Sequence, residues 1–437
     1  MDLKDIIWLK DHETILQLER QIEEDETFRI ALQSSLMIAQ QRAYASLNRD
    51  LFHAIDNVFG GNGQGWPTLP EQYVAYVKKY MVLIPNEIDD PEYPNAWTSN
   101  STTNGYTQKV YDLLCQFYFL VDQELPDLNI ILQNYKSDIN DFDFSLWLRE
   151  FAVDWGLFLD TKESFPISAK ASFFANPMYN MPLYKDDAPN WTSFNNFFYR
   201  EFNGSDERGH TPLRPIAEPG NNNAIVSPAD CTYIQQYPIS ENGEVLGISG
   251  QPTSVTLKNT HQVFTVAQLL ENEGLAEAFN GGTFVHYFLS PFDYHRFHSP
   301  AKGEVKECKW AQGKVFLDVN LTNGGEFDAP DSAEGGYEFL QSRGVFVVDT
   351  KEEMGLVAAI PIGMAQVSGV DMYTDKLLGN DVEKGDEFGK FMFGGSDIIV
   401  LFQKNPNLYL WEKDPGHNPI HFQFGQVSAY WDVSKQL

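Results

Sequence analysis

Apolar and polar residues follow two different periods along this chain, and the period changes near residue 165. In the first part, apolar residues recur every three or four positions at Val110, Leu113, Leu114, Phe117, Leu120 and Val121. The same spacing returns at Phe144, Trp147, Leu148, Phe151, Trp155 and Phe158. It places apolar side chains on one face of an α-helix. The pattern predicts helices over 110–121 and 144–158, within a helical N-terminal domain.

After residue 165 the pattern changes to short runs rich in β-branched and aromatic residues, separated by glycine and proline. Such runs are typical of strands in a barrel or sandwich. The strands are predicted at 283–289, 314–321, 344–349, 356–362 and 398–402. Residues 322–336, rich in Gly, Asp and Glu, are expected to form an exposed loop. The predicted fold class is α+β, with a helical domain over 1–165 and a β-rich, barrel- or sandwich-like domain over 166–437.

Composition narrows the class of protein. The 437 residues are too many for one ordinary core, and 43% hydrophobic residues exclude a disordered chain. A net charge of −30 opposes binding to nucleic acid or to an anionic membrane. Three widely spaced cysteines favour neither a disulfide framework nor a cysteine-rich zinc module. The acidic N-terminus lacks the pattern of a secretory signal, and no apolar run has the length of a membrane span. We therefore expect a soluble, cytoplasmic protein without stable membrane insertion.

Two histidines lie close together in the sequence, His295 and His298, and three interpretations compete for them. They could be structural residues at a strand end, where alternation would point them to opposite faces unless a turn intervenes. They could belong to a zinc site with His286, although no HExxH or CxxC motif supports one. They could also act as a general base and a general acid. Spacing alone leaves these alternatives open.

Two further motifs carry candidate chemistry. Gly394-Gly395-Ser396 precedes a predicted strand, which is usual for a tight turn. A serine directly after an unshielded glycine carbonyl can also attack that carbonyl once a base removes its proton. Asp230, in Ser227-Pro228-Ala229-Asp230, can stabilise a turn or orient a histidine. The order of the three candidate groups along the chain is Asp, His, Ser.

Together these motifs resemble those of the phosphatidylserine decarboxylase family. The family's Pro-x-Asp, Tyr-His-Arg-x-His-x-Pro and Gly-Ser motifs correspond to 228–230, 294–300 and 395–396. Residues 194–202 and Arg214-Pro215 are similar to a further segment of the family. The N-terminal part, with its segment 154–159, resembles a soluble branch that decarboxylates free aromatic amino acids such as tryptophan. This chain has Asp397 where the membrane enzymes usually have Thr, which puts a phosphatidylserine head-group site in doubt.

The resemblance implies a zymogen that cleaves itself. His298, oriented by Asp230, would remove the Ser396 hydroxyl proton, and Ser396 would attack the Gly395 carbonyl to form an ester. Elimination would then separate a heavy chain ending at Gly395 from a light chain beginning at residue 396. Loss of ammonia would leave a covalent pyruvoyl group at that position. This pyruvoyl cofactor would form a Schiff base with the substrate and take the place of pyridoxal phosphate, and His295 would protonate the carbanion. The resemblance implies no metal.

The function implied is pyruvoyl-dependent decarboxylation of a free L-amino acid, expected to be aromatic, yielding an amine and carbon dioxide. Two alternatives remain open. One is a phosphatidylserine decarboxylase that makes phosphatidylethanolamine. The other is a non-catalytic, uncleaved homologue that acts as a binding protein. The expected partner is the small-molecule substrate, with no nucleic acid. Whether the chain forms a homodimer is left open.

Overall fold

The computed structural model describes residues 12–97, 108–125, 128–185, 191–247, 249–252, 254–257, 260–315, 317–329, 339, 341–364, 369–393, 395–432 and 434. The chain forms two compact units. The first consists of Met1–Met181, Thr192–Phe194 and Val315–Pro330, and the second of Pro182–Trp191, Asn195–Lys314 and Asp331–Leu437. The domain boundary after residue 165 was inferred from the change of period along the sequence and stays a prediction.

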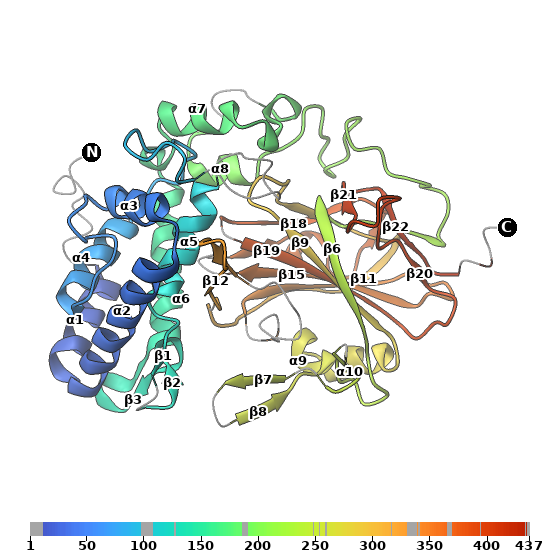
Figure 1. Ribbon diagram of the computed structural model, residues 1–437. Helices are drawn as coiled ribbons and strands as arrows, with labels where there is room; N and C mark the ends of the chain where they lie inside the picture. The colour runs from blue at the N-terminus through green and yellow to red at the C-terminus, as the bar shows by residue number, and fades with distance from the viewer. Residues whose placement is uncertain are drawn as a thin grey trace. The chain divides into compact units, whose positions relative to one another are not determined.

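The first unit is mainly helical, as the period of its apolar residues predicts (Figure 1). Asp143 begins the helix predicted over 144–158, because its carboxylate accepts hydrogen bonds from the N–H groups of Ser145 and Leu146. Trp147 and Trp155 are buried on one face of that helix. No helix among the described residues is both long and apolar enough to cross a bilayer. The helices are α1 (Glu13–Glu24), α2 (Glu26–Ser46), α3 (Arg49–Val58), α4 (Pro70–Tyr80), α5 (Lys109–Phe119), α6 (Phe144–Leu159) and α7 (Ile167–Ala175).

Short strand pairs complete this unit: β1 (Glu124–Leu125) with β2 (Ile130–Ile131), β3 (Lys136–Ser137) with β4 (Phe142–Asp143), and β12 (Asn320–Leu321) with β13 (Phe327–Asp328). The prediction of a strand over 314–321 is wrong except at its end, where Asn320–Leu321 form β12. The main chain there bonds to side chains instead of to a strand. Gln133 accepts from the N–H of Leu317 and donates to its carbonyl, and Asp122 accepts from the N–H of Val319. In the loop predicted over 322–336, residues 327–328 form β13, and residues 330–336 lie outside the described part.

The second unit contains an eight-stranded antiparallel sheet in the order β17-β11-β14-β15-β19-β9-β6-β21 (Figure 1). Its central strands are nearly continuous apolar runs, because both of their faces are buried. The sheet confirms the strands predicted at 283–289, 344–349, 356–362 and 398–402. Its strands are β6 (Cys231–Pro238), β9 (Thr283–Leu289), β11 (Gly303–Ala311), β14 (Arg343–Asp349), β15 (Leu356–Met364), β17 (Asp381–Val382), β19 (Gly395–Phe402) and β21 (His421–Phe422).

Smaller elements surround this sheet. One three-stranded sheet has the order β10-β18-β16, another has the order β20-β22-β5, and β7 pairs with β8. These strands are β5 (Ala224–Val226), β7 (Ser254–Leu257), β8 (Thr260–Val263), β10 (Arg296–His298), β16 (Val370–Met372), β18 (Glu387–Phe391), β20 (Tyr409–Leu410) and β22 (Val427–Tyr430). The helices are α8 (Phe194–Phe198), which begins in the first unit, and α9 (Val266–Leu270), α10 (Glu273–Ala276) and α11 (Thr374–Leu377).

The two faces of the large sheet have different coverings. Ile399 and Leu401 point to the face where an apolar cluster includes Leu269 and Leu270 of α9. On the opposite face, Phe346 of β14 stacks on Phe388 of β18, with ring centroids 4.1 Å apart. The sheet β10-β18-β16 therefore packs on this second face. Because side chains alternate along a strand, Ser396 points to the face covered by β18.

Candidate active site

Ser396 lies near the start of β19, a central strand of the large sheet. It pairs with Gly363 of β15 and with Leu289 of β9. Its side chain is fully buried, and its hydroxyl has no hydrogen-bond partner among the described residues. A buried hydroxyl in this state costs about 1–3 kcal/mol and calls for an explanation, of which a chemical role is one. Gly394, which belongs to the same predicted motif, lies outside the described residues.

The Asp and His motifs are joined directly by the main chain. The N–H of His298 donates to the carbonyl of Pro228 at 2.7 Å, and the N–H of Val226 donates to the carbonyl of Pro300 at 3.0 Å. Strand β10, which contains His298, pairs with β18. Since β18 covers the face of the large sheet to which Ser396 points, all three motifs contribute to one region of the second unit.

His295 is held between aromatic rings. Its imidazole stacks on Phe198, with ring centroids 3.9 Å apart, and meets the edge of Phe391. Neither ring nitrogen has a hydrogen-bond partner among the described residues. Burial lowers the pKa of His295 well below its usual value, and the nearby positive charge of Arg200 lowers it further. His295 is therefore neutral at physiological pH.

A series of ring contacts connects His295 with the segment before Ser396. Phe198 also meets Phe393 edge-on, with centroids 5.1 Å apart. The N–H of Phe391 donates to the carbonyl of His295 at 2.9 Å. The imidazole thus lies in an aromatic environment that includes Phe393, three residues before Ser396.

His298 occupies a different environment, and its contacts define its tautomer. Nδ1 lies 2.9 Å from the carbonyl oxygen of Gly385, which can only accept, so Nδ1 carries the proton. Nε2 therefore accepts a hydrogen bond from the hydroxyl of Tyr294 at 3.2 Å. The pKa of His298 is lowered to about 4, mainly by burial, which the negative charge of Glu387 partly opposes. The ring is a neutral imidazole whose Nε2 can act as a proton acceptor.

Asp230 does not reach His298 directly. One carboxylate oxygen pairs with the Nη2 of Arg214 at 3.0 Å, and the other accepts the N–H of Phe424 at 2.8 Å. The expected Asp230–His298 hydrogen bond is absent among the described residues. Instead, the ring of Phe424 lies flat on His298, with centroids 3.9 Å apart and planes at 6°. Among the described residues, Asp230 is thus connected to His298 through Phe424.

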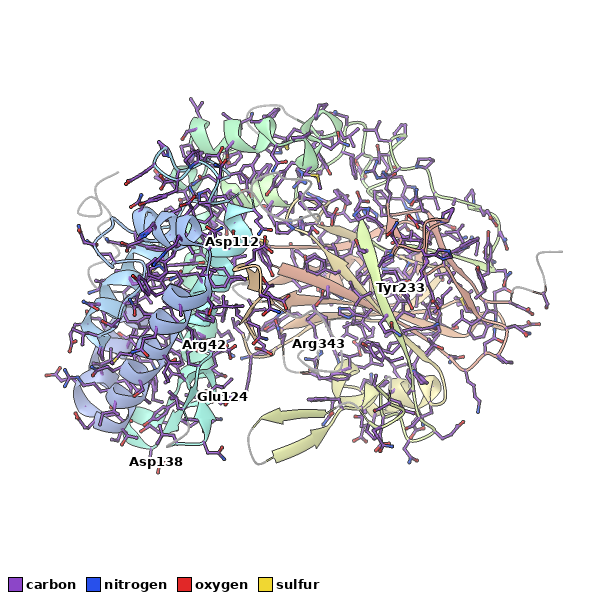
Figure 2. All side chains as sticks on the ribbon, in the orientation of Figure 1. Arg42, Asp112, Glu124, Asp138, Tyr233 and Arg343 are labelled. Carbon is purple, nitrogen blue, oxygen red and sulfur yellow. The ribbon has the colours of Figure 1, made fainter. Side chains whose placement is uncertain are left out.

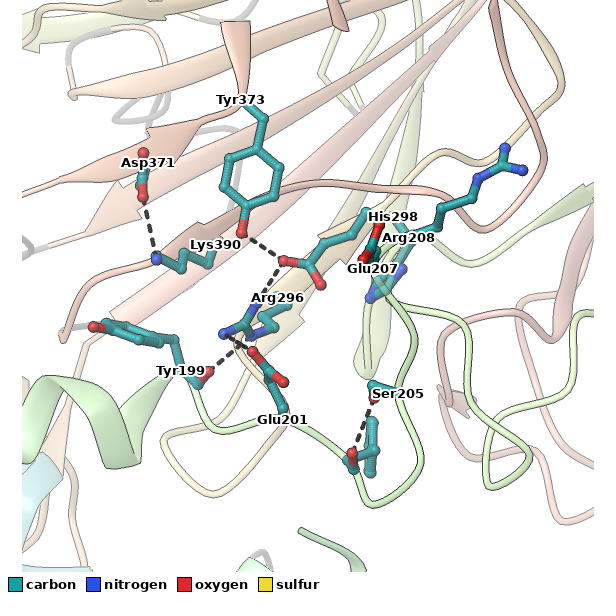
Figure 3. A network of polar contacts seen from close by, with 12 residues as sticks. Tyr199, Glu201, Ser205, Glu207, Arg208, Arg296, His298, Asp371, Tyr373 and Lys390 are labelled. Atoms are coloured by element: carbon teal, nitrogen blue, oxygen red, sulfur yellow. Dashed lines mark hydrogen bonds and ion pairs between the residues drawn. The ribbon is translucent and has the colours of Figure 1, made fainter. Parts of the chain in front are cut away.

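Arg296 lies between the two histidines in the sequence, and a polar network holds its side chain (Figure 3). The guanidinium pairs with Glu387 at 2.7 Å and with Glu201 at 3.1 Å, and it donates to the carbonyl of Tyr199 at 2.8 Å. The hydroxyl of Tyr373 donates to Glu387 at 2.6 Å. This network borders a cleft of about 920 Å³ and fixes β10, so it holds the backbone between His295 and His298 in place.

The four predicted residues are not hydrogen-bonded to one another among the described residues. Ser396 makes no hydrogen bond to His295, His298 or Asp230 among the described residues. His286, the alternative zinc ligand, lies in β9 and contacts Asp397 instead, with 3.4 Å between Nε2 and Oδ1. The described residues contain no group of three side chains that could hold a metal ion. Sequence reasoning missed Phe198 and Phe424 as contacts of the histidines. Phe198 lies in the segment 194–202 that resembles the family, but nothing in that segment relates it to a histidine, and Phe424 has no local signal, since a phenylalanine is ordinarily a core residue.

Comparisons with known proteins identify the family. A family model described as phosphatidylserine decarboxylase matches residues 194–427, more than half of the chain. The chain is 31% identical over 259 residues to a phosphatidylserine decarboxylase proenzyme of Fusobacterium nucleatum, covering 59% of this chain and 75% of that protein. It is 29% identical over 269 residues to phosphatidylserine decarboxylase proenzyme 3 of Schizosaccharomyces pombe, covering 61% and 24%.

A third relative has a different name. The chain is 26% identical over 290 residues to decarboxylase iboD of Amanita muscaria, covering 59% of this chain and 77% of that protein. The matched region 194–427 contains all three motifs of the site. The chain belongs to the phosphatidylserine decarboxylase family, whose members are pyruvoyl-dependent carboxy-lyases.

Proposed function

We propose that this protein is a pyruvoyl-dependent decarboxylase of a free aromatic L-amino acid, with tryptophan as the first candidate. The observation that carries the proposal is the buried hydroxyl of Ser396, which lacks a hydrogen-bond partner among the described residues and stands at the family's Gly-Ser motif. If Ser396 is converted into a pyruvoyl group, its hydroxyl is lost, so the mature protein needs no hydrogen-bond partner for that hydroxyl. The same position fits a pyruvoyl group derived from Ser396.

Self-cleavage between Gly395 and Ser396 needs a base. His298 suits this role, because its neutral ring leaves Nε2 as an acceptor and the Gly385 carbonyl holds the proton on Nδ1. Tyr294 donates to Nε2 and can relay a proton to it. Asp230 keeps Phe424 against the ring and so limits its rotation. The products would be a heavy chain over 1–395 and a light chain over 396–437.

During turnover the pyruvoyl group would accept the electrons released when carbon dioxide leaves. Aromatic side chains of the second unit would surround the substrate. Phe198, Phe391 and Phe393 form an apolar, aromatic environment around His295, which suits an aromatic side chain. His295 stacks on Phe198 within this environment. We assign to it the proton that reaches the substrate carbon after carbon dioxide leaves: the neutral ring would donate its N–H proton to that carbon while its other nitrogen accepts a proton from water.

The net charge of −30 supports a small, water-soluble substrate, since an anionic bilayer would repel this surface. It also agrees with a cytoplasmic location, which we propose on the same ground. The names of the Fusobacterium and Schizosaccharomyces relatives favour a second candidate, a phosphatidylserine decarboxylase. The two candidates share the cleavage chemistry and differ only in substrate.

Intact mass under denaturing conditions tests the cleavage. We expect two chains that meet at Gly395 and Ser396, the smaller one blocked by a pyruvoyl group. Ser396→Ala should give one intact, inactive chain. The matched control is Ser428→Ala, which removes another buried hydroxyl of the second unit and should leave cleavage unchanged. An intact wild-type chain would contradict the proposal and favour a non-catalytic binding protein.

Parallel assays then separate the two substrates. Carbon dioxide release is measured with free L-tryptophan, L-tyrosine and L-phenylalanine, and with vesicles that contain phosphatidylserine. Faster release from a free amino acid supports the proposal. Turnover of the vesicles alone would establish the second candidate.

A further inference from the structure

A short, strongly anchored segment connects β9, the neighbour of the cleavage strand β19, with His295. It runs over residues 290–295 and is called here the His295 loop. Its first residue follows Leu289, which pairs with Ser396, and its last is His295 itself. Any displacement of this loop would therefore change the position of the imidazole relative to β19.

Arg200 provides the main anchor of this loop. Its guanidinium is buried, and its Nη2 donates to the carbonyls of Phe292 at 2.7 Å and Asp293 at 2.9 Å. Nη1 donates to the carbonyl of Phe198 at 3.3 Å. Phe198 is also the residue on which His295 stacks. One buried cation thus holds both the loop that ends in His295 and the backbone of the ring that supports it.

We propose that Arg200 is a positioning residue of this decarboxylase, which fixes the His295 loop against Phe198 and so places the imidazole for turnover. This proposal rests on the function proposed above. The guanidinium is itself oriented, because its carbon lies 4.4 Å from the centroid of Tyr184. A rigid, planar donor suits this task better than a lysine, whose ammonium cannot span several carbonyls in one plane.

A second contact at the loop supports the same role. The carboxylate of Asp293 accepts the N–H of Ser290 at 2.8 Å, which closes the loop on itself, and its other oxygen lies 2.9 Å from Nε2 of His421. Asp293 is buried. The loop is therefore held at its carbonyls by Arg200 and at its centre by Asp293.

The charge of Arg200 has a separate, measurable effect. Other charged groups on the elements that pack against His295 are engaged elsewhere: Asp293 with His421, Lys390 with Asp371, and Arg296 with Glu201 and Glu387. Arg200 is the group whose charge disfavours protonation of His295. Removing this charge should raise the pKa of His295, whether the imidazole acts as a base or as an acid.

The experiment compares Arg200→Gln and Arg200→Lys with Arg343→Gln. Arg343, labelled in Figure 2, is the matched control, because it is also buried and donates to three main-chain carbonyls, those of Leu269, Gln341 and Gln268. Each variant is checked for cleavage by intact mass. The kcat and KM for L-tryptophan, or for the best amino acid of the screen above, are then measured from pH 5 to 9.

For Arg200→Gln we expect cleaved enzyme, a kcat lowered about 10- to 100-fold, and an upward movement of the acid limb of the pH profile that reports His295. Arg200→Lys should also lower kcat, with little change in KM, but should leave the limb in place because the charge remains. Arg343→Gln should reduce thermal stability without moving the limb. If Arg200→Gln does not fold, the kcat of Arg200→Lys tests the positioning role: a lowered kcat supports it and a wild-type kcat contradicts it.

Wild-type kcat in Arg200→Lys, or an unmoved limb in a folded Arg200→Gln enzyme, would overturn the proposal. An uncleaved or inactive wild-type chain would instead overturn the proposed function, and the role of Arg200 would fall with it. The mass spectrum of the wild-type protein distinguishes these two failures.

Discussion

Replacing Asp230 by asparagine removes a charge whose partner is buried. The carboxylate lies 3.0 Å from Nη2 of Arg214, and the two side chains are only 6% and 8% exposed. The second oxygen accepts the N–H of Phe424 at 2.8 Å. An asparagine has one carbonyl oxygen, so it can accept from Arg214 or from Phe424 but cannot accept fully from both.

The size of the effect follows from burial. Removing one partner of a buried ion pair costs about 3–5 kcal/mol, because the other charge stays desolvated. Asparagine keeps one of the two hydrogen bonds, so we expect Asp230→Asn to lower the free energy of unfolding by about 3 kcal/mol. Adding Arg214→Met removes the uncompensated charge, so the double variant should regain about 1–2 kcal/mol relative to Asp230→Asn.

Urea unfolding measures these differences, and intact mass follows cleavage in the same samples. The control is Asp381→Asn, which breaks an exposed 3.2 Å pair with Lys351 and should change stability far less than Asp230→Asn. Cleavage should be slower in Asp230→Asn, because Phe424 and Arg214 then compete for one acceptor oxygen and Phe424 is held less firmly against His298. Equal stability of Asp230→Asn and Asp381→Asn, or a double variant less stable than Asp230→Asn, would contradict this prediction.

Three further predictions concern other buried positions. Burial raises the pKa of Glu87 from 4.5 to about 8, so between these values the folded protein binds a proton that the unfolded chain releases. Glu87→Gln should therefore stabilise the protein by about 1–3 kcal/mol at pH 7.5, measured by thermal unfolding. A less stable Glu87→Gln protein at that pH would contradict the raised pKa of Glu87. The pKa of His298 is lowered from 6.5 to about 4, so its contribution to stability is complete above pH 6.5 and is lost as pH falls toward 4, by up to about 3 kcal/mol. His298→Asn should flatten this part of the stability profile, and an unchanged slope would count against a neutral, buried ring. At Gly389 a Cβ would lie 2.3 Å from the carbonyl of Asp371 and 2.4 Å from the ring of Phe297, so Gly389→Ala should cost about 1–3 kcal/mol or more. Gly220→Ala, with nothing within 4 Å, should behave as wild type in the same melts.

Much of the fold could be predicted because burial imposes its period on the sequence. Helices α5 and α6 follow the spacing of their apolar residues, and β9 has the bounds 283–289 that its run of β-branched and aromatic residues predicted. The segment 314–321 has the composition of a strand, yet its main chain bonds to Gln133 and Asp122, which are almost 200 residues away. No local pattern contains that information, because the competing hydrogen bonds come from distant side chains.

The candidate site, like the fold, could be predicted from the sequence only in part. Asp230, His295, His298 and Ser396 could be named as candidates because their ordered motifs resemble those of the family, and residue type and order can be read from the sequence. Their surroundings could be read only from the folded chain. The two histidines lie in different aromatic environments. Asp230 binds Arg214 and, among the described residues, no histidine, and Arg200 binds the His295 loop through its carbonyls. The physical reason is that desolvation, ring stacking and buried ion pairs depend on distances in space, which a linear motif does not specify.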